Sequence, residues 1–586
     1  TMNMKIKFII PALAFALAIV SCNPDRLDIP QKGRITTDTF YQNDEDAEAA
    51  MVAAYQGFLW NVCTKEGGDI YAPYRAAFNL CGDDMYAAGE SFGDNDYMAA
   101  LNEFRYDSGS GVIRNAYNNL YYAMYYSNLV IDHFKDGDTP VQKRVTAEAR
   151  VLRAWMHMML AIGWGTPPLV DHVLQSKDNP YNCNTSPDNP MSHDELLLWC
   201  AKECEDAVAD LDERKDKSDK DGAVKVTKGF AWAVAGKARL FAKDYAGAKK
   251  DLFEVIKSNK YDLVPGDRYW ENFHLEGDCN EEKIFEANIE LNSNISVFWD
   301  IVNRSTWMEA NIWGWRSDHF VAGADPCSAY TSIEGWGGCG VPQSFADEFV
   351  ANDGPDSYRI KATIVPIEDA IYNTVYGNDK IDGLTLEQKM ASKDLGINIK
   401  GLYGQSFYLP LKQLARKTDL SAVGQNVRVN NFVIMRYAEV LLMYAEACVQ
   451  SGDAASALPY IQKIQTRAGS KTVSSAVTMD VVKREKKLEM WLEGCRWPDM
   501  VRWGDTKAVE SAGQAVPVLY DKFTRMPDPK DEGLTWHKDG RFYTVLTHKA
   551  IDRGDKVGFV AGKHEVFPFP VTVTSVNDNI TQNPKW

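Results

Sequence analysis

The sequence has 586 residues, which by length alone is enough for one large core or for two to three domains. Its net charge of −17 argues against a nucleic-acid partner, which would need a basic surface, and suits a solvated domain. Its 11 cysteines do not require a disulfide scaffold, because a core of this size does not need one.

The first 21 residues have the pattern of an export signal. Two lysines precede an apolar run from Phe8 to Val20, which is shorter than the roughly 20 residues that span a membrane. The run ends in "IVSC", which resembles a lipobox, where the chain is cut before an acylated cysteine. We therefore expect a lipoprotein signal peptide over residues 1–21 and lipidation of Cys22. An ordinary signal peptide with an incidental cysteine is the alternative.

Amphipathic patterns predict paired helices in the N-terminal part of the chain. Apolar and aromatic residues recur every three or four positions over 112–134 and 141–164, and so short a breaker between them predicts an antiparallel hairpin. Further helices are expected over 193–213, 226–243 and 243–259. Residues 41–265 are therefore expected to form a helical unit.

The next stretch, residues 266–430, has a different composition. It is rich in glycine, asparagine, aspartate and aromatic residues, and its periodicity is weak. Such a stretch is typical of surface loops with a few short strands, and loops this long in a compact protein are usually functional. We interpret it as a ligand-binding insertion. Cys327 and Cys339 flank a glycine-rich loop in it and are a candidate disulfide pair.

Helical patterns return near the C-terminal side. They cover 432–452, 453–469 and 479–497, the last ending before Pro498, so 431–505 is expected to form helical hairpins and 506–586 an irregular segment. "KDYAGAKKDLFEVI" and "GDAASALPYIQKI" share small residues and an apolar stripe, which is the tetratricopeptide pattern. The predicted fold is mainly α: tetratricopeptide-like hairpins stacked as a scaffold, with a long loop-rich insertion carrying a few short strands.

Motifs for catalysis or metal binding are weak. "GESFG" at 89–93 has the letters of a nucleophile elbow but lacks the flanking strand and helix. Cys200 and Cys204 lie one helical turn apart, yet no further ligand cluster accompanies them. Carboxylates such as Asp83 and Asp84 could serve a glycosidase, but among 81 acidic residues their adjacency has little weight. We expect no metal, no cofactor and no enzyme activity.

Several stretches together resemble one protein family. They include "AEARVLRAWMHMMLAIGWGTPPLV" (147–170), "GVPQSFADEFVANDGPDSYR" (340–359), "REKKLEMWLEGCRWPDMVRWG" (484–504) and "VFPFPVTVTSVNDNITQNPKW" (566–586). These are similar to motifs of the SusD/RagB outer-membrane nutrient-binding lipoproteins, in the same order along the chain. Lys486 and Lys585 depart from the usual arginine and glycine, and "PFP" from the usual Pro-Ile-Pro.

The resemblance implies a cell-surface lipoprotein of the Bacteroidota. Residues 22–40 would form a lipid-anchored segment that holds the protein on the outer membrane, facing the cell exterior. The protein would bind a glycan or a peptide, act as the lid of a SusC-like TonB-dependent transporter and perform no catalysis. A surface glycosidase and a pure tetratricopeptide scaffold are the alternatives.

Most charged motif residues have a simpler interpretation than ligand binding. On amphipathic helices they would pair with one another and thereby mark the fold. This applies to Arg150, Arg153, Glu485, Glu489, Glu493 and Arg496.

Aromatic residues of the insertion are the candidate ligand site. Six of the 16 tryptophans fall between residues 270 and 336, and an indole face can stack on the C–H groups of a sugar ring. Trp336 is the first candidate because glycines on its C-terminal side leave it uncovered. Tryptophans that merely attach loops to the helical scaffold are the alternative. The further candidates are Trp313, Trp315, Trp299 and Trp307, with Asp83, Asp84 and Tyr86 of an early loop that lies near the site in relatives.

Overall fold

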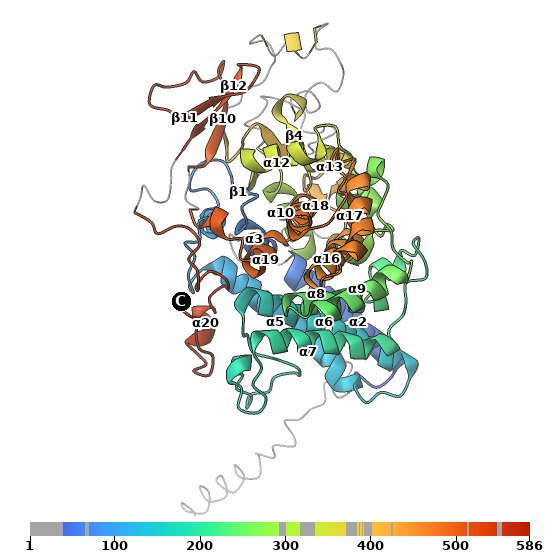
Figure 1. Ribbon diagram of the computed structural model, residues 1–586. Coiled ribbons are helices and arrows are strands. Elements are labelled where there is room, and N and C mark those ends of the chain that lie inside the picture. The colour runs from blue at the N-terminus through green and yellow to red at the C-terminus, as the bar shows by residue number, and fades with distance from the viewer. Residues whose placement is uncertain are drawn as a thin grey trace, which may run out of the picture.

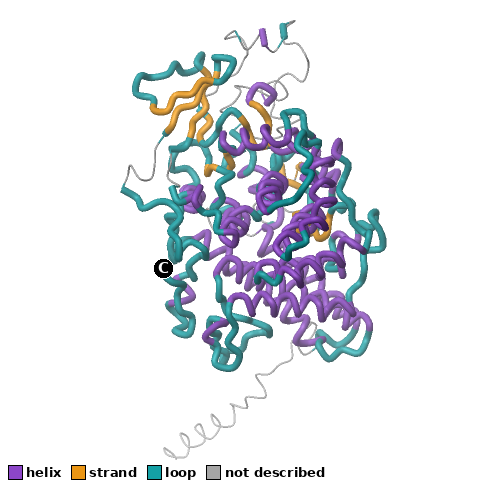
Figure 2. The backbone as a smooth tube through the Cα atoms, in the orientation of Figure 1, coloured by secondary structure: helices purple, strands orange, loops and turns teal. Residues whose placement is uncertain are grey.

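A computed structural model describes residues 39–64, 70–291, 300–316, 335–370, 401–422, 426–511, 515–547 and 554–586, together with a few positions between 384 and 391. Cys22, Trp299 and Cys327 lie outside the described residues. Figure 2 shows that helices fill one end of the molecule, while most strands gather toward the other. Among the described residues, no helix is long and apolar enough to cross a membrane.

Stacked helices form the scaffold, as predicted. Each helix packs against the next one in the series α5, α6, α7, α8, α9, α16, α17, and α2 packs on α5 and α6 (Figure 1). The bounds are α2 (Asp44–Phe58), α5 (Gly111–Phe134), α6 (Pro140–Trp164), α7 (His193–Ala207), α8 (Lys228–Phe241), α9 (Tyr245–Lys257), α16 (Tyr437–Gln450) and α17 (Ala454–Ala468). We call this set the helical body. The chain leaves it after α9 and returns at α16.

Local sequence explains where these helices begin. Thr139 caps α6 by accepting a hydrogen bond from Gln142, with Pro140 in the first turn. Ser192 and Glu195 form a complete capping box at α7.

Close packing of α8 against α9 depends on a glycine. The ideal Cβ of an alanine at Gly236 of α8 would lie 2.5 Å from Leu252 Cγ of α9, so the glycine permits the close approach of the two helices.

Two helix predictions differ from the structure. The stretch 432–452 begins as a strand, β9 (Phe432–Arg436), which pairs with β2 (Lys283–Ala287) before α16 starts. This apolar run is compatible with the periodicity of a helix and with that of a strand, and its pairing with the distant strand β2 makes it a strand. The predicted helix over 479–497 ends earlier: α18 spans Met479–Glu489, and Pro498 lies inside the next helix, α19 (Arg496–Trp503).

The segments outside the helical body combine short helices with short strands. The helices are α3 (Pro73–Leu80), α4 (Asp96–Asn102), α10 (Ile301–Ile312), α12 (Gln343–Asp353), α13 (Tyr358–Thr363) and α20 (Val571–Thr574). The paired strands are β1 (Tyr86–Ala87) with β3 (Cys339–Gly340), β4 (Ile364–Pro366) with β6 (Tyr408–Pro410), and β7 (Leu420–Ala422) with β8 (Asn426–Arg428).

Residues predicted as an irregular C-terminal segment contain an antiparallel sheet. Its order is β11-β12-β10-β5, with β5 (Leu402–Tyr403), β10 (Pro517–Asp521), β11 (Glu532–Trp536) and β12 (Phe542–Leu546). Figure 1 shows β10, β11 and β12 projecting at the upper left, away from the helical body. All five residues of β11 are exposed, so this strand lacks the apolar alternation by which a strand is found in a sequence.

Cysteines are reduced throughout the described residues. Eight of the nine there are buried, and Cys279 is partly exposed. Cys339, one member of the predicted disulfide pair, is among the buried free thiols. Cys200 and Cys204 lie in the apolar core under α7, and no group of three metal-binding side chains occurs in the part of the chain that the structure describes.

Candidate ligand-binding site

Three partly exposed aromatic residues, Tyr71, Trp307 and Trp336, lie together at the surface and are named here the aromatic group. The rings of Trp307 and Trp336 are perpendicular, with centroids 5.4 Å apart. The ring of Tyr71 also contacts Trp336, with centroids 5.2 Å apart and an interplanar angle of 48°. Rings at these separations and angles are in favourable edge-to-face and tilted contact. Two of the predicted site residues, Trp307 and Trp336, are thereby brought together.

Backbone hydrogen bonds hold the Trp336 segment against the end of α10. The amides of Trp336, Gly337 and Gly338 donate to the carbonyls of Asn311, Gly314 and Ile312 at 2.7 to 2.8 Å. A Cβ added at Gly338 would lie 2.8 Å from the Ile312 carbonyl oxygen, and one at Gly335 would lie 2.2 Å from the Gly314 carbonyl carbon. The glycines around Trp336 therefore permit a close backbone approach that fixes its indole in place.

The early loop does lie beside this segment. In the β1–β3 ladder, Tyr86 pairs with Gly340 and Ala87 with Cys339. The partly exposed Tyr86 packs with Phe92 against Tyr403. The structure thus places Tyr86 one strand away from the segment that carries Trp336.

Asp83 is paired with cations inside the fold, and Asp84 is buried beside it. Asp83 accepts hydrogen bonds from Arg496 at 2.6 and 2.9 Å, and Lys487 lies 3.3 Å away. Burial opposes the charge of Asp83, but the hydrogen bonds and charge of Arg496 lower its pKa to about 2. Asp84 is 3% exposed, and burial followed by the charge of Asp83 raises its pKa to about 7. Both carboxyl groups are therefore part of the packed interior of the fold.

Trp313 and Trp315 are buried, with 2% and 1% of their surface exposed. The Trp313 indole Nε1 donates to Glu309 at 2.7 Å, and the guanidinium of Arg75 lies 5.0 Å from the ring centroid. An indole covered in this way has no face on which a sugar ring could stack. The tripeptide "WGW" could not reveal this, because burial of Trp313 depends on Arg75, which is far away in the sequence.

Polar groups near the aromatic group were missed from sequence. Arg316 lies 3.3 Å from Glu90, and a Cβ at Gly337 would lie 3.2 Å from Arg316 Cγ, so this ion pair borders the Trp336 segment. Tyr71 was missed as well. It stands in a short polar stretch, 265 residues before Trp336, and no periodicity links the two.

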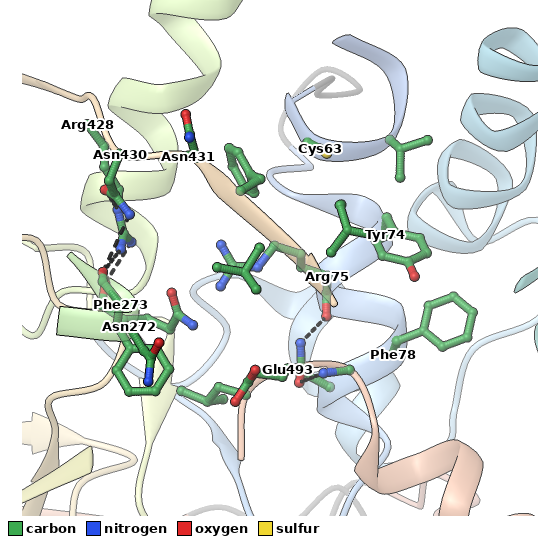
Figure 3. A pocket seen from close by; sticks show the side chains of 18 of the residues that line it. Cys63, Tyr74, Arg75, Phe78, Asn272, Phe273, Arg428, Asn430, Asn431 and Glu493 are labelled. Carbon is green, nitrogen blue, oxygen red and sulfur yellow. Dashed lines mark hydrogen bonds between the residues drawn. The ribbon is translucent and has the colours of Figure 1, made fainter. Parts of the chain in front are cut away.

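A small cavity lined by both polar and apolar side chains lies next to α3 (Figure 3). Its volume is about 110 Å³, and its lining includes Arg75, Asn272, Arg428, Asn430 and Glu493. Arg428 and Asn430 already donate to the Phe273 carbonyl, at 2.8 and 3.4 Å. Pockets that hold small-molecule ligands usually measure about 300–1,000 Å³, so this cavity has room for a few water molecules and not for a sugar unit.

A larger hollow of about 610 Å³ lies between α2 and β2. Its lining includes three aromatic residues: Phe58 and Phe285, which are each 1% exposed, and the partly exposed Tyr55. It therefore has the volume of a ligand site but offers less aromatic surface for stacking than the aromatic group does.

Charged motif residues pair as predicted. Glu203 accepts from Arg150 and Arg153, and Glu489 lies within 3.1 Å of three arginines. Lys486, which replaces the family's usual arginine, forms a buried pair with Asp499 at 2.8 Å. These residues hold the fold together.

Known proteins resemble this chain in both sequence and fold. Residues 314–586 match the SusD family. A SusD-like protein of Bacteroides ovatus is 23% identical over 529 residues, covering 85% of this chain and 83% of that protein. SusD-like protein P38 of Formosa agariphila is 22% identical, covering 89% of this chain and 95% of that protein.

Among solved structures, a laminarin binding SusD-like protein superimposes with a TM-score of 0.67 at 20% identity, covering 93% of this chain and all of that one. Surface glycan-binding protein A from Bacteroides thetaiotaomicron, solved with laminarihexaose, gives 0.66 at 20% identity, covering 92% and 100%. At these identities the superpositions establish a shared fold.

Proposed function

Since the chain belongs to the SusD family, we propose that it is a cell-surface lipoprotein that binds an oligosaccharide at the aromatic group. In the same proposal, the protein is anchored to the outer membrane through lipid on Cys22, faces the cell exterior and acts as the lid of a SusC-like TonB-dependent transporter. It binds its ligand and does not cleave it.

The observation that carries the binding proposal is the arrangement of Trp336, Trp307 and Tyr71. The two indoles are perpendicular and both are partly exposed, so each adds aromatic surface to the same small region. The electron-rich face suits the C–H groups of a pyranose, while the neighbouring Arg316–Glu90 pair supplies a donor and acceptors for hydroxyl groups.

A glycan is favoured over a peptide. Solved relatives are described as binding laminarin and laminarihexaose. A peptide bound in extended form would need an open strand edge near the aromatic group. There β1 and β3 pair with each other, and each has only two residues.

The proposal is tested by affinity electrophoresis and calorimetry with laminarin, xyloglucan and mannan, alongside a peptide panel. Trp336→Ala should weaken binding of the retained polysaccharide about five-fold or more, the scale of one aromatic contact. Trp232→Ala is the matched control, since Trp232 is also partly exposed but lies on α8 in the helical body.

Unchanged affinity of a folded Trp336→Ala protein would contradict the assignment of the site. Retention by the peptides alone would favour the peptide-binding alternative. Release of new reducing ends from the polysaccharide would contradict the absence of catalysis. The lid role would fail if the lipidated protein, extracted in mild detergent from its native membrane, purified without any transporter.

A further inference from the structure

The C-terminal sheet is joined by hydrogen bonds to the segment that carries Trp336. β11, β12, β10 and β5 pair in that order, and a β-bridge connects Tyr403 of β5 to Gly89, just after β1. β1 in turn pairs with β3. A run of paired strands therefore leads from β3, which follows Trp336 in the chain, to β11, which carries Trp536; five strand spacings, roughly 24 Å, separate these two strands.

Aromatic side chains line one face of this run. Across the antiparallel ladders, Trp536 pairs with Tyr543, and Tyr543 with Tyr520. Val518, two residues before Tyr520 in β10, pairs with Tyr403. Directly paired residues and residues two apart share a face, so Trp536, Tyr543, Tyr520 and Tyr403 lie on one side, named here the sheet face.

The sheet face extends toward the aromatic group. Trp536 and Tyr543 have ring centroids 5.1 Å apart, and Tyr543 and Tyr520 are stacked at 5.7 Å. Beyond Tyr403, the partly exposed rings of Phe92 and Tyr86 continue it to β1, beside the Trp336 segment. The row of rings, with Tyr543 and Tyr403 buried in it, therefore leads from the outermost strand to the segment beside the proposed ligand site.

Burial is uneven along the sheet face. On the opposite side, Leu519 and Phe542 are 0% exposed, which is the packing that stabilises the sheet. On the sheet face, Tyr543 is 0% and Tyr403 is 8% exposed, whereas Trp536 is 43% exposed at the outermost strand. The accessible aromatic surface therefore lies at the outer end of the sheet, where an exposed indole on a projecting edge strand adds little to folding.

Polar groups also border the sheet face. The guanidinium of Arg525 lies 4.4 Å from the Tyr520 ring centroid and donates to the Tyr543 hydroxyl at 2.9 Å. Asp531 accepts from Arg525 at 2.9 and 2.6 Å, which fixes its position. Aromatic rings thus lie beside an arginine–carboxylate pair here, as they do at the aromatic group, where the pair is Arg316 and Glu90.

The free edge of β11 does not suit a peptide strand. The ladder has a bulge between Glu532 and Thr535, and Gly533 has a positive φ of 57°. A bulged edge interrupts the regular row of N–H and C=O groups that an added strand requires. A ligand recognised through ring stacking has no need of that row.

We propose that the sheet face is a second oligosaccharide subsite, at which a long glycan held by the aromatic group makes a further contact with Trp536. This inference rests on the proposed function. A chain long enough to reach both places gains avidity from the second contact, whereas a short oligosaccharide occupies only one.

The experiment compares a polysaccharide with its own trisaccharide. Laminarin, xyloglucan and mannan are embedded in native gels, and the trisaccharide of each series is titrated calorimetrically into wild type, Trp536→Ala and Trp336→Ala. Trp536→Ala should reduce retention by the bound polysaccharide about five-fold and leave trisaccharide affinity unchanged. Trp336→Ala should weaken both. Met526→Ala, which removes a side chain 70% exposed in the β10–β11 connection, should change neither.

Three results would overturn the inference. If Trp336→Ala loses binding while Trp536→Ala retains the polysaccharide as wild type does, the second subsite is absent and the proposed function stands. If Trp536→Ala weakens trisaccharide and polysaccharide equally, Trp536 belongs to the first site. If none of the three polysaccharides retards the wild type, the proposed function fails and the inference with it. Circular dichroism confirms that each variant is folded.

Discussion

Asp83 and Asp84 are neighbours in the chain, yet their carboxyl groups have opposite electrostatic environments. Arg496 and Lys487 favour the charged form of Asp83, whereas burial and the charge of Asp83 favour the protonated form of Asp84. Asp83 pairs with Lys487 of α18 and Arg496 of α19, and these ion pairs fasten the early loop to the two helices. The two carboxyl groups therefore have structural roles and are not arranged as a catalytic pair.

Asp84 should make the stability of the protein depend on pH. Its pKa of about 7 lies above the usual value near 4, so between pH 4 and 7 the folded state binds a proton that the unfolded state releases. The contribution of Asp84 to the free energy of unfolding is therefore greatest at low pH and is lost as the pH rises toward 7. Asp84→Asn should remove this slope.

Urea unfolding of wild type and Asp84→Asn at pH 4.5 and 7.5 measures the effect. From pH 4.5 to pH 7.5, we expect the free energy of unfolding of the variant to increase by more than about 1 kcal/mol relative to that of wild type. One pKa unit corresponds to about 1.4 kcal/mol. Asp83→Asn, which removes a carboxylate paired with Arg496, should lose stability at pH 7.5. An equal difference at both pH values would show that Asp84 is ionised throughout.

Whether the exposure of a single residue can be predicted from sequence depends on whether the residues that pack against it are also close to it in the chain. Trp336 was favoured because of adjacent glycines, which are visible in the sequence, although their role proved to be close packing against α10. Trp313 and Trp315 are the next candidates from the sequence, after Trp336. Their burial comes from residues such as Arg75, far away in the chain, which no local pattern identifies.

At the scale of elements, the β1–β3 ladder depends on Gly340. A Cβ at this position would lie 1.9 Å from the Gly404 carbonyl oxygen, so either β3 or the β5 connection must move. Gly340→Ala should therefore lower the free energy of unfolding by about 1–3 kcal/mol, the usual cost of overpacking, and weaken glycan binding through displacement of the Trp336 segment.

Urea unfolding and calorimetry check both effects. Gly109→Ala is a suitable control, because the nearest atom to its Cβ would be Asp107 Oδ1 at 3.2 Å, on a side chain that can move. If Gly340→Ala unfolds and binds as Gly109→Ala does, the ladder tolerates the extra methyl group and does not position Trp336.

Long helices could be predicted and short strands could not. The prediction of 112–134 and 141–164 agrees with α5 and α6 to within a residue at each end, because both helices bury a full apolar stripe. β1 and β3 have two residues each and depend on a partner more than 250 residues away. The sequence places β9 in the same helix as α16 because no glycine or proline separates its apolar residues from those of the helix.

Across the whole molecule, a buried ionic network joins segments far apart in the chain. Arg436, at the end of β9, contacts Glu282, Glu489 and Glu493 at 2.6 to 2.8 Å. Arg359 of α13 pairs with Glu485 and Glu489 of α18 at 3.1 Å. The sequence predicted that the glutamates would pair, but their arginine partners come from elements that only the complete fold brings together.

Arg436→Met should destabilise the protein by about 3–5 kcal/mol, because it removes the cation that all three buried carboxylates, Glu282, Glu489 and Glu493, share. Lys202→Met serves as the control: Lys202 pairs with Asp206 at 2.8 Å, but its side chain is 70% exposed, so the loss should stay below about 1 kcal/mol. Urea unfolding at neutral pH measures both. Equal losses in the two variants would show that the network adds nothing beyond a surface ion pair.

The buried thiols have a consequence for the dynamics of the molecule. A thiol reacts as its thiolate, and burial raises the pKa of Cys200 in α7, Cys448 in α16 and Cys339 in β3. Each of these cysteines can therefore be alkylated only after its own element opens, so the rate of labelling reports the frequency of that opening. Mass spectrometry of the native protein, without any introduced probe, could then compare how often the helical body opens with how often the strand beside Trp336 does, and whether a bound glycan slows only the second.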